Sequence, residues 1–258
     1  LRATFADKFD DRMANVINEN RRIGVGFTGM TEWYASHGFR WTEARHSKVI
    51  DRKLQLISEA VREEADSYAE ELGCNAPIKT MAIAPTGSIS LLAGVTPSLQ
   101  PPFARYFIRR IRYADNDPQL KELSADYHAE ADIYSDNTTV VEIPMADPIL
   151  DRFPDNLIQQ TDEISVEEFL ANQAFLQRHI DNAISATVNL QPGVSAIELG
   201  SAIKKWLPHL KGVTCFPEVS RPQSPYEPIS RDQYNESLSA EVGQGFDEEC
   251  ATGACPIR

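Results

Sequence analysis

IKTMAIAPTGSIS, at residues 78–90, combines a strand pattern with a helix pattern. Residues 78–84 alternate and then become apolar, which predicts a buried strand. PTGS, at residues 85–88, ends that strand, and residues 89–93 are compatible with a helix. A strand that turns directly into a helix is typical of an α/β fold.

Further helices and strands are predicted on both sides of this stretch. Helices are predicted at residues 5–20, 47–72 and 165–189. Gly73 is a plausible C-cap of the second helix, and Ser165 with Glu168 forms an apparent capping box for the third. Strands are predicted at residues 22–31, 107–113, 140–144 and 209–216. Because helices separate the strands, we expect a parallel α/β architecture.

Composition and charge narrow the class of protein. The chain has 258 residues, 42% hydrophobic and 24% charged, which suits one large α/β domain or a piece of a larger one. It begins with Leu1 rather than methionine, so we expect it to start partway through a larger protein. A net charge of −13 argues against non-specific nucleic-acid binding, which needs Lys and Arg to neutralise phosphates.

The expected location is the cytoplasm. No apolar run is long enough to cross a membrane, and no signal peptide opens the chain. Four cysteines in a chain of this length do not form a secreted disulfide framework.

The amino-acid composition of the chain changes from about Ser220. Three prolines, Pro222, Pro225 and Pro228, are followed by a polar and acidic run at residues 230–249. Such a segment has little apolar surface to offset the entropy lost on ordering, so we expect a flexible tail. The predicted division is therefore a folded part at residues 1–222 and a tail at residues 223–258.

The turn after the first predicted strand is a candidate phosphate-binding loop. Free N–H groups at a helix start attract anions, and Gly87 lets a ligand approach the backbone. The candidate residues are Thr86, Gly87, Ser88, Ile89 and Ser90, of which Thr86, Ser88 and Ser90 add hydroxyl donors. The alternative is an ordinary Ser/Thr cap with no ligand.

Cys250 and Cys255 form a second candidate site. They are spaced C-x4-C near the C-terminus, with small residues between them, so their sulfurs can reach bonding distance with little strain. An exposed dithiol exchanges readily, which indicates an electron shuttle between a site and an external reductant. The alternatives are half of a zinc site or two idle thiols.

The remaining charged and metal-binding residue types give weaker signals. Arg109, Arg110 and Arg112 could contact a cofactor or a partner subunit, or pair with acids of this chain. Cys74 and Cys215 are isolated, and the five histidines show no metal-ligand spacing, so no metal site is predicted.

Six segments, in their order and spacing, resemble the monomeric type of adenosylcobalamin-dependent (class II) ribonucleotide reductase. They are RRIGVG at 21–26, IKT leading into PTGSIS at 78–90, YFIRRIR at 106–112, KGVT at 211–214, PYEPI at 225–229, and the terminal C-x4-C-P-I at 250–257. The resemblance covers nearly the whole chain and implies the second half of a ten-stranded α/β barrel, followed by the tail.

The resemblance also implies a function. In this family the segment matching residues 85–90 holds the substrate's phosphates, and the pair matching Cys250 and Cys255 re-reduces the active-site disulfide. A thioredoxin-like partner then reduces the tail pair. The implied substrates are ribonucleotides, usually triphosphates, and the implied cofactor is adenosylcobalamin.

One departure from the family is large. Its members carry a radical-forming cysteine on a finger loop, and no segment of this chain resembles that loop. The resemblance therefore implies an N-terminal part elsewhere, without which this chain is inactive. Three alternatives remain open: a stand-alone dithiol carrier, a nucleotide-binding module without radical chemistry, and a dimeric type of reductase.

Overall fold

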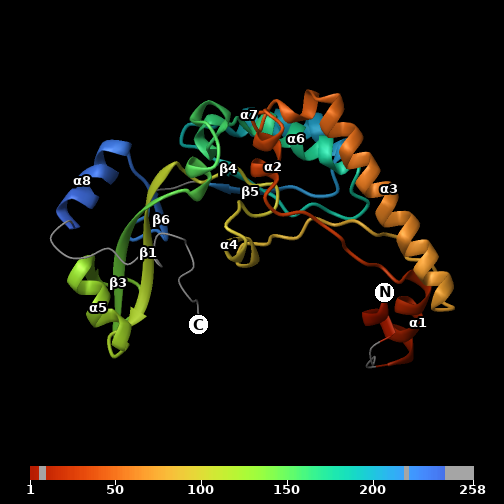
Figure 1. Cartoon of the computed structure of the whole chain (residues 1–258), viewed down its shortest axis with the longest axis horizontal. Coiled ribbons are helices and arrows are strands. Elements are labelled where there is room, and N and C mark those ends of the chain that lie inside the picture. Colours follow the sequence, from red (N-terminus) through yellow and green to blue (C-terminus); the bar gives the residue numbers. More distant parts are fainter. Residues whose placement is uncertain (6–9, 218–220, 242–258) are drawn as a thin grey trace.

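The computed structural model describes residues 1–5, 10–217 and 221–241 (Figure 1). Its helices are α1 (Asp11–Asn20), α2 (Met30–Ser36), α3 (Lys48–Glu71), α4 (Ile89–Leu92), α5 (Pro118–Asp126), α6 (Val166–Gln177), α7 (Ala196–Trp206) and α8 (Arg231–Glu241). Its strands are β1 (Tyr106–Ala114), β2 (His128–Ala131), β3 (Thr138–Ala146), β4 (Thr187–Leu190), β5 (Thr214–Pro217) and β6 (Tyr226–Pro228).

The larger sheet is antiparallel and lies to one side of the helical part. Its four strands have the order β2-β3-β1-β6. β1 and β3 pair over their full length, from Tyr106 opposite Ala146 to Ala114 opposite Thr138. Figure 1 shows this sheet with α5 and α8 on the left, α2, α3, α6 and α7 above and to the right, and α4 between the two groups.

Parallel pairing occurs in a second set of short segments. β4 and β5 form a two-stranded parallel sheet. Val25 forms an isolated parallel bridge with Met81, and Ile83 forms another with Ile184. Residues 23–25, 79–83 and 182–185 therefore run side by side, joined by backbone bonds such as Ala82 N–H to Val25 O (2.9 Å) and Ser185 N–H to Ile83 O (2.8 Å).

The core packs against these parallel segments and is built around α6. Nine of the twelve α6 residues are buried, so the helix is covered on all sides rather than along one stripe. Trp41 is 1% exposed, packs on Phe169 with 5.3 Å between ring centroids, and donates its indole N–H to Leu99 O at 2.9 Å. Met81 and Ile83 belong to the same core, so residues 79–83 are held against it.

Helices whose start and end signals are local agree with the sequence. The helix predicted at 47–72 is α3, in which the Ser47 side chain accepts from Ile50 N–H, and Gly73 follows in a left-handed conformation (φ +63°). The Ser165–Glu168 capping box is present at the start of α6. α1 begins at Asp11, and α6 ends at Gln177, well short of the predicted residue 189.

The prediction of a parallel α/β architecture is wrong for two of the predicted strands. The segments predicted at 107–113 and 140–144 are β1 and β3, which are antiparallel neighbours. The chain between them, which includes α5 and β2, brings β3 back alongside β1 instead of crossing over to a parallel position. No closed sheet is formed by the residues that the structure describes.

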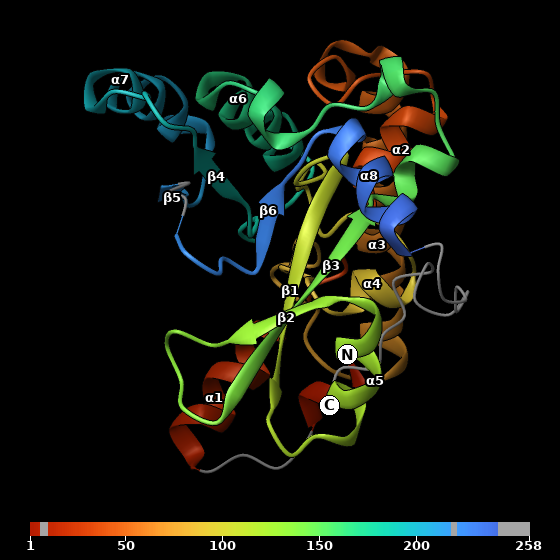
Figure 2. The same ribbon diagram turned by 90° about the vertical axis from the view of Figure 1, so that its left-hand side faces the viewer.

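Part of the predicted tail belongs to the larger sheet. Tyr226–Pro228 is β6 and pairs with β1, and α8 follows it (Figure 2). Of the predicted tail at residues 223–258, the structure describes residues 223–241. No helix among the described ranges is both long and apolar enough to cross a membrane.

Candidate functional site

The candidate loop lies on the surface where residues 79–83 end. Ile83 is buried, whereas Ala84, Gly87, Ser88 and Ile89 are exposed. The helix that follows, α4, is a single turn of four residues. A macrodipole of that length is small, so the local arrangement of N–H groups matters more than the helix.

The backbone of the loop turns sharply and leaves several donors without a partner among the described residues. Thr86 adopts a left-handed conformation (φ +51°), and Ser88 is in the right-handed helical region. Ser90 N–H donates to Thr86 O at 2.9 Å and closes the turn. The N–H groups of Gly87, Ser88 and Ile89 donate to no other described residue. Successive free N–H groups in such a turn form an anion-binding nest.

Of the three hydroxyl groups of the loop, those of Thr86 and Ser90 contact other described residues. Thr86 Oγ1 accepts from Ser98 N–H at 2.7 Å and lies 3.1 Å from Thr28 Oγ1. Ser90 is fully buried, with its hydroxyl oriented towards Gly87 O at 3.5 Å. The expected three hydroxyl donors therefore reduce to one, Ser88, and the Thr86 side chain holds the loop in shape.

A buried acid that the sequence did not indicate anchors the far end of the loop. Glu32, which is 7% exposed, accepts from Thr96 N–H (2.8 Å) and Thr96 Oγ1 (2.6 Å). Arg152 pairs with Glu32 at 3.4 Å and also donates to Gly94 O. Glu32 and Thr96 are 64 residues apart, so no local pattern links them.

Asp147 lies beside this anchor. Its carboxylate accepts from Ile149 N–H at 3.0 Å. Burial, with a smaller contribution from the neighbouring Glu32, raises the pKa of Asp147 to about 6. The bond from Ile149 and the charge of Arg152 oppose this rise but do not cancel it.

A second acid holds the start of residues 79–83. The Asp181 carboxylate accepts from Thr80 N–H (2.9 Å) and Met81 N–H (2.8 Å) and pairs with Arg62 at 3.0 Å. Partial burial would raise its pKa, but these N–H bonds and the nearby cations outweigh it and lower the pKa. Carboxylates from distant segments therefore accept hydrogen bonds from the chain on both sides of the loop, Asp181 before it and Glu32 after it.

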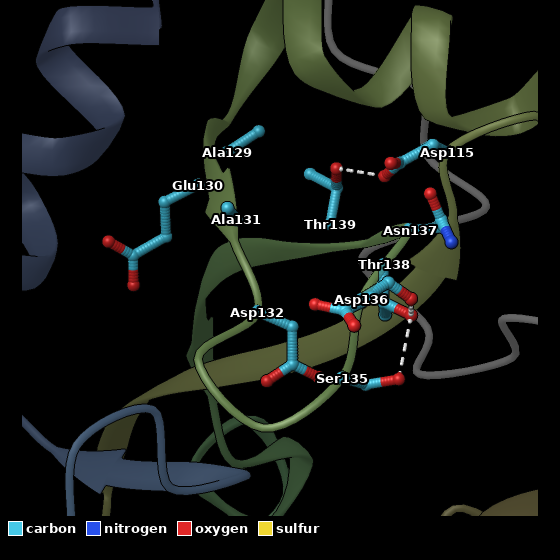
Figure 3. A pocket seen from close by; sticks show the side chains of 10 residues that line it. All are labelled: Asp115, Ala129, Glu130, Ala131, Asp132, Ser135, Asp136, Asn137, Thr138 and Thr139. Atoms are coloured by element: carbon cyan, nitrogen blue, oxygen red, sulfur yellow. Dashed lines mark hydrogen bonds between the residues drawn. The ribbon is translucent and has the colours of Figure 1, made fainter.

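Two cavities of the described residues lie away from this loop. One, of about 310 Å³, lies at the β2–β3 turn and is lined by Asp115, Glu130, Asp132 and Asp136 among others (Figure 3). Its carboxylates would repel a phosphate, so it is not a nucleotide site. The other, of about 330 Å³, is apolar and lies between residues 23–25 and α3.

The arginines of YFIRRIR pair with acids of this chain. Arg110 contacts Glu142 and Glu227, each at 2.6 Å, and Arg112 contacts Asp132 at 2.9 Å. Arg109 makes no ion pair with another described residue. The alternative that these arginines pair with acids of this chain is therefore confirmed for Arg110 and Arg112.

The predicted redox pair cannot be placed. Cys250 and Cys255 lie outside the described residues. Cys74 and Cys215 are free and half-buried, and burial raises the pKa of the Cys215 thiol. Within the described ranges, no three His, Cys, Asp or Glu side chains gather as a metal site would require.

Comparison with known proteins identifies the family. The ribonucleotide reductase barrel-domain family matches residues 78–215. The whole chain aligns at 31% identity with 39% of the adenosylcobalamin-dependent ribonucleoside-triphosphate reductase of Lactobacillus leichmannii. It aligns at 38% identity with 40% of a Mycobacterium phage D29 protein assigned to the same kind of reductase.

Solved structures agree with the sequence relatives. A crystal structure of a B-12 dependent (class II) ribonucleotide reductase superposes with a TM-score of 0.80 at 30% identity, over 95% of this chain and 36% of that one. The class Id ribonucleotide reductase alpha subunit of Actinobacillus ureae shares the fold, with a TM-score of 0.55 at 19% identity, over 85% of this chain and 43% of that one. This chain spans about 40% of the length of the curated relatives it matches. The chain belongs to the ribonucleotide reductase barrel-domain family.

Proposed function

We propose that this chain is part of an adenosylcobalamin-dependent reductase that converts ribonucleotides, most simply the triphosphates, into 2′-deoxyribonucleotides. The names of the relatives support the reaction and the cofactor. The fold relationship at 30% identity supports a barrel that this chain completes as its second half. The reductase is expected to work in the cytoplasm.

The loop at residues 86–90 is proposed to hold the substrate's phosphates. The observation that carries this role is the turn in which Gly87, Ser88 and Ile89 present unpaired N–H groups beside the Ser88 hydroxyl. N–H bonds to a charged oxygen are stronger than neutral ones. Gly87 suits this role, because a Cβ at that position would meet nothing and would occupy the space that a phosphate needs.

Cys250 and Cys255 are proposed to supply electrons to the active site. Reduction of one ribonucleotide replaces the 2′-hydroxyl by hydrogen, releases water, and oxidises a pair of active-site thiols to a disulfide. Thiol–disulfide exchange with Cys250 and Cys255 restores that pair and leaves the tail pair oxidised. A thioredoxin-like dithiol then reduces the tail.

The radical-forming cysteine and the cofactor are proposed to reside with the rest of the reductase. The two cavities described above are at the low end of the range for small-molecule pockets, and the loop lines neither of them. Neither of these two cavities by itself fits a cofactor as large as adenosylcobalamin. We therefore assign none of them to it.

The tail role is tested by Cys250→Ser in the complete reductase. The variant should lose repeated turnover with a thioredoxin reductant and keep a single turnover, because only the relay is broken. Product per enzyme is measured by rapid quench. Loss of the single turnover as well would contradict the assignment.

The loop role is tested by Gly87→Val. We expect nucleotide affinity to fall about ten- to hundredfold, the effect of losing one charge-assisted hydrogen bond. Gly200→Val is the matched control, because a Cβ there also meets nothing. Unchanged affinity in Gly87→Val, measured by equilibrium binding, would remove the loop from the substrate site.

A further inference from the structure

The segment that leads into the redox tail is fastened to the larger sheet. β6 pairs with β1, with Tyr226 opposite Arg109 and Pro228 opposite Phe107. Arg110 N–H donates to Pro225 O at 2.8 Å, and Ile229 N–H donates to Tyr106 O at 3.0 Å. β6 has three residues, so backbone pairing alone gives it few bonds.

Arg110 adds side-chain contacts to this short strand. Its side chain is 11% exposed and pairs with Glu142 of β3 and Glu227 of β6, each at 2.6 Å. It also donates to Ser224 O at 3.1 Å. One guanidinium group therefore joins β3, β6 and the turn before β6, in the forked geometry that suits arginine.

Gln223 fastens the same turn to the β2–β3 hairpin. It is 7% exposed and left-handed (φ +53°), a conformation that a non-glycine residue keeps only when its surroundings hold it. Its amide oxygen accepts from Ile133 N–H at 2.9 Å, and its amide nitrogen donates to Glu130 (2.7 Å) and Ala131 O (2.8 Å).

Two neighbouring contacts complete the attachment. Arg112 donates to Gln223 O at 3.0 Å through Nη2, while its Nε pairs with Asp132, whose side chain is 1% exposed. Tyr234 of α8 packs on Tyr106 of β1 with 5.0 Å between ring centroids. Glu130 and Asp132 both line the hairpin hollow of Figure 3, and each of them contacts a residue of this attachment.

We propose that Arg110, Arg112 and Gln223 form a clamp that sets the tether point of the redox tail, so that YFIRRIR positions the dithiol and does not bind cofactor. This inference rests on the proposed role of Cys250 and Cys255. With the clamp closed, the tether starts at the end of α8, and Cys250 lies nine positions after Glu241.

Opening the clamp would lengthen the tether. If residues 221–241 were released, the tether would start at Pro217, and Cys250 would lie 33 positions after it. The effective concentration of a tethered group falls roughly as the −3/2 power of tether length, so delivery of the dithiol should slow about sevenfold.

The test isolates the electron-transfer step in the complete, fully reduced enzyme, without an external reductant. Each product consumes one dithiol, so an enzyme with a reduced active-site pair and a reduced tail pair makes two products. The first uses the active-site pair alone. The second must wait for the tail pair, so its rate in a rapid-quench experiment reports delivery.

The clamp variants are Gln223→Ala and Arg110→Gln. Both should form the first product at the native rate and the second about sevenfold more slowly. Amide hydrogen exchange should show faster exchange of Ile229 N–H in both variants. Gln119→Ala, an exposed glutamine of α5 on the same sheet, is the matched control and should match the native enzyme in both phases.

Each other outcome contradicts a separate claim. A native rate for the second product, in variants whose Ile229 exchange has increased, overturns the clamp and leaves the tail relay intact. Equal slowing of both products shows a general structural role and also overturns it. If the native enzyme makes one product, or if Cys250→Ser makes two, the relay itself fails, and the clamp fails with it.

Discussion

At the scale of single residues, the loop depends on acids that lie far from it in the sequence. The Glu32 carboxylate accepts a hydrogen bond from Thr96 N–H and pairs with Arg152, and Arg152 in turn donates to Gly94 O. Asp147 lies close enough to this group for the charge of Glu32 to raise its pKa. Among the described residues, Arg152 forms an ion pair with Glu32 alone, and its charge only partly offsets the burial that makes the charged form of Asp147 costly.

Asp147→Asn tests this cost through the pH dependence of stability. With its pKa raised to about 6, native Asp147 keeps a proton that the unfolded chain releases near pH 4. Stability should therefore fall as pH rises from 4 to 6 and level off above, by on the order of 2 kcal/mol. Asparagine keeps an acceptor for Ile149 N–H, so the variant of the complete reductase should melt higher than the native protein at pH 7.5.

The comparison at pH 5 and pH 7.5 decides whether charge is the cause. The melting difference between Asp147→Asn and the native protein should shrink at pH 5. Asp117→Asn is the control, since Asp117 caps α5 through Gln119 N–H ahead of a proline, much as Asp147 does before its own turn. A melting difference that is the same at both pH values would contradict this account.

At the scale of elements, one glycine explains why residues 23–26 can lie against residues 79–83. A Cβ built on Gly26 would lie 1.9 Å from Ala82 O, a contact that forces the two segments apart. A Cβ on Gly24 would lie 3.0 Å from Ala82 Cβ, which small shifts can relieve. The RRIGVG segment therefore needs its second glycine more than its first.

Gly26→Ala should destabilise the protein by about 1–3 kcal/mol, the usual cost of overpacking, and Gly24→Ala by less. Thermal unfolding of the two variants in the complete reductase measures this order. Equal losses in both variants would show that the close approach at Ala82 does not limit the pairing.

The elements also show what the sequence could and could not predict. The ends of α3 and the capping box of α6 follow from residues within one turn, and both were predicted. The pairing of β1 with β3 joins residues on both sides of an inserted helix and strand, and no periodicity specifies it. The loop turn was predicted from its own residues, whereas its anchors Glu32 and Asp181 come from distant segments.

At the scale of the whole molecule, the parallel segments at residues 23–25, 79–83 and 182–185 bury some apolar side chains, such as Met81 and Ile83, and leave others exposed nearby. Val25 is 43% exposed and Ile78 is 48% exposed, and the apolar cavity beside residues 23–25 continues this surface onto α3. On the loop, Ile89 is 61% and Leu92 is 87% exposed. Exposed apolar side chains that cluster along short strands indicate a surface that another element covers.

We propose that the part of the reductase that matches the remaining 60% or so of a relative's length covers this surface. Activity should therefore depend on the presence of that part. This chain alone, given adenosylcobalamin, a ribonucleoside triphosphate and a dithiol, should form no deoxyribonucleotide, whereas a polypeptide that also carries the rest of the barrel should form it. Light scattering should show the isolated chain self-associating through its apolar surface, and the added part should suppress this. Product formation by the isolated chain would mean that the radical-forming residue lies within these 258 residues, and the loop and the dithiol would then need new roles.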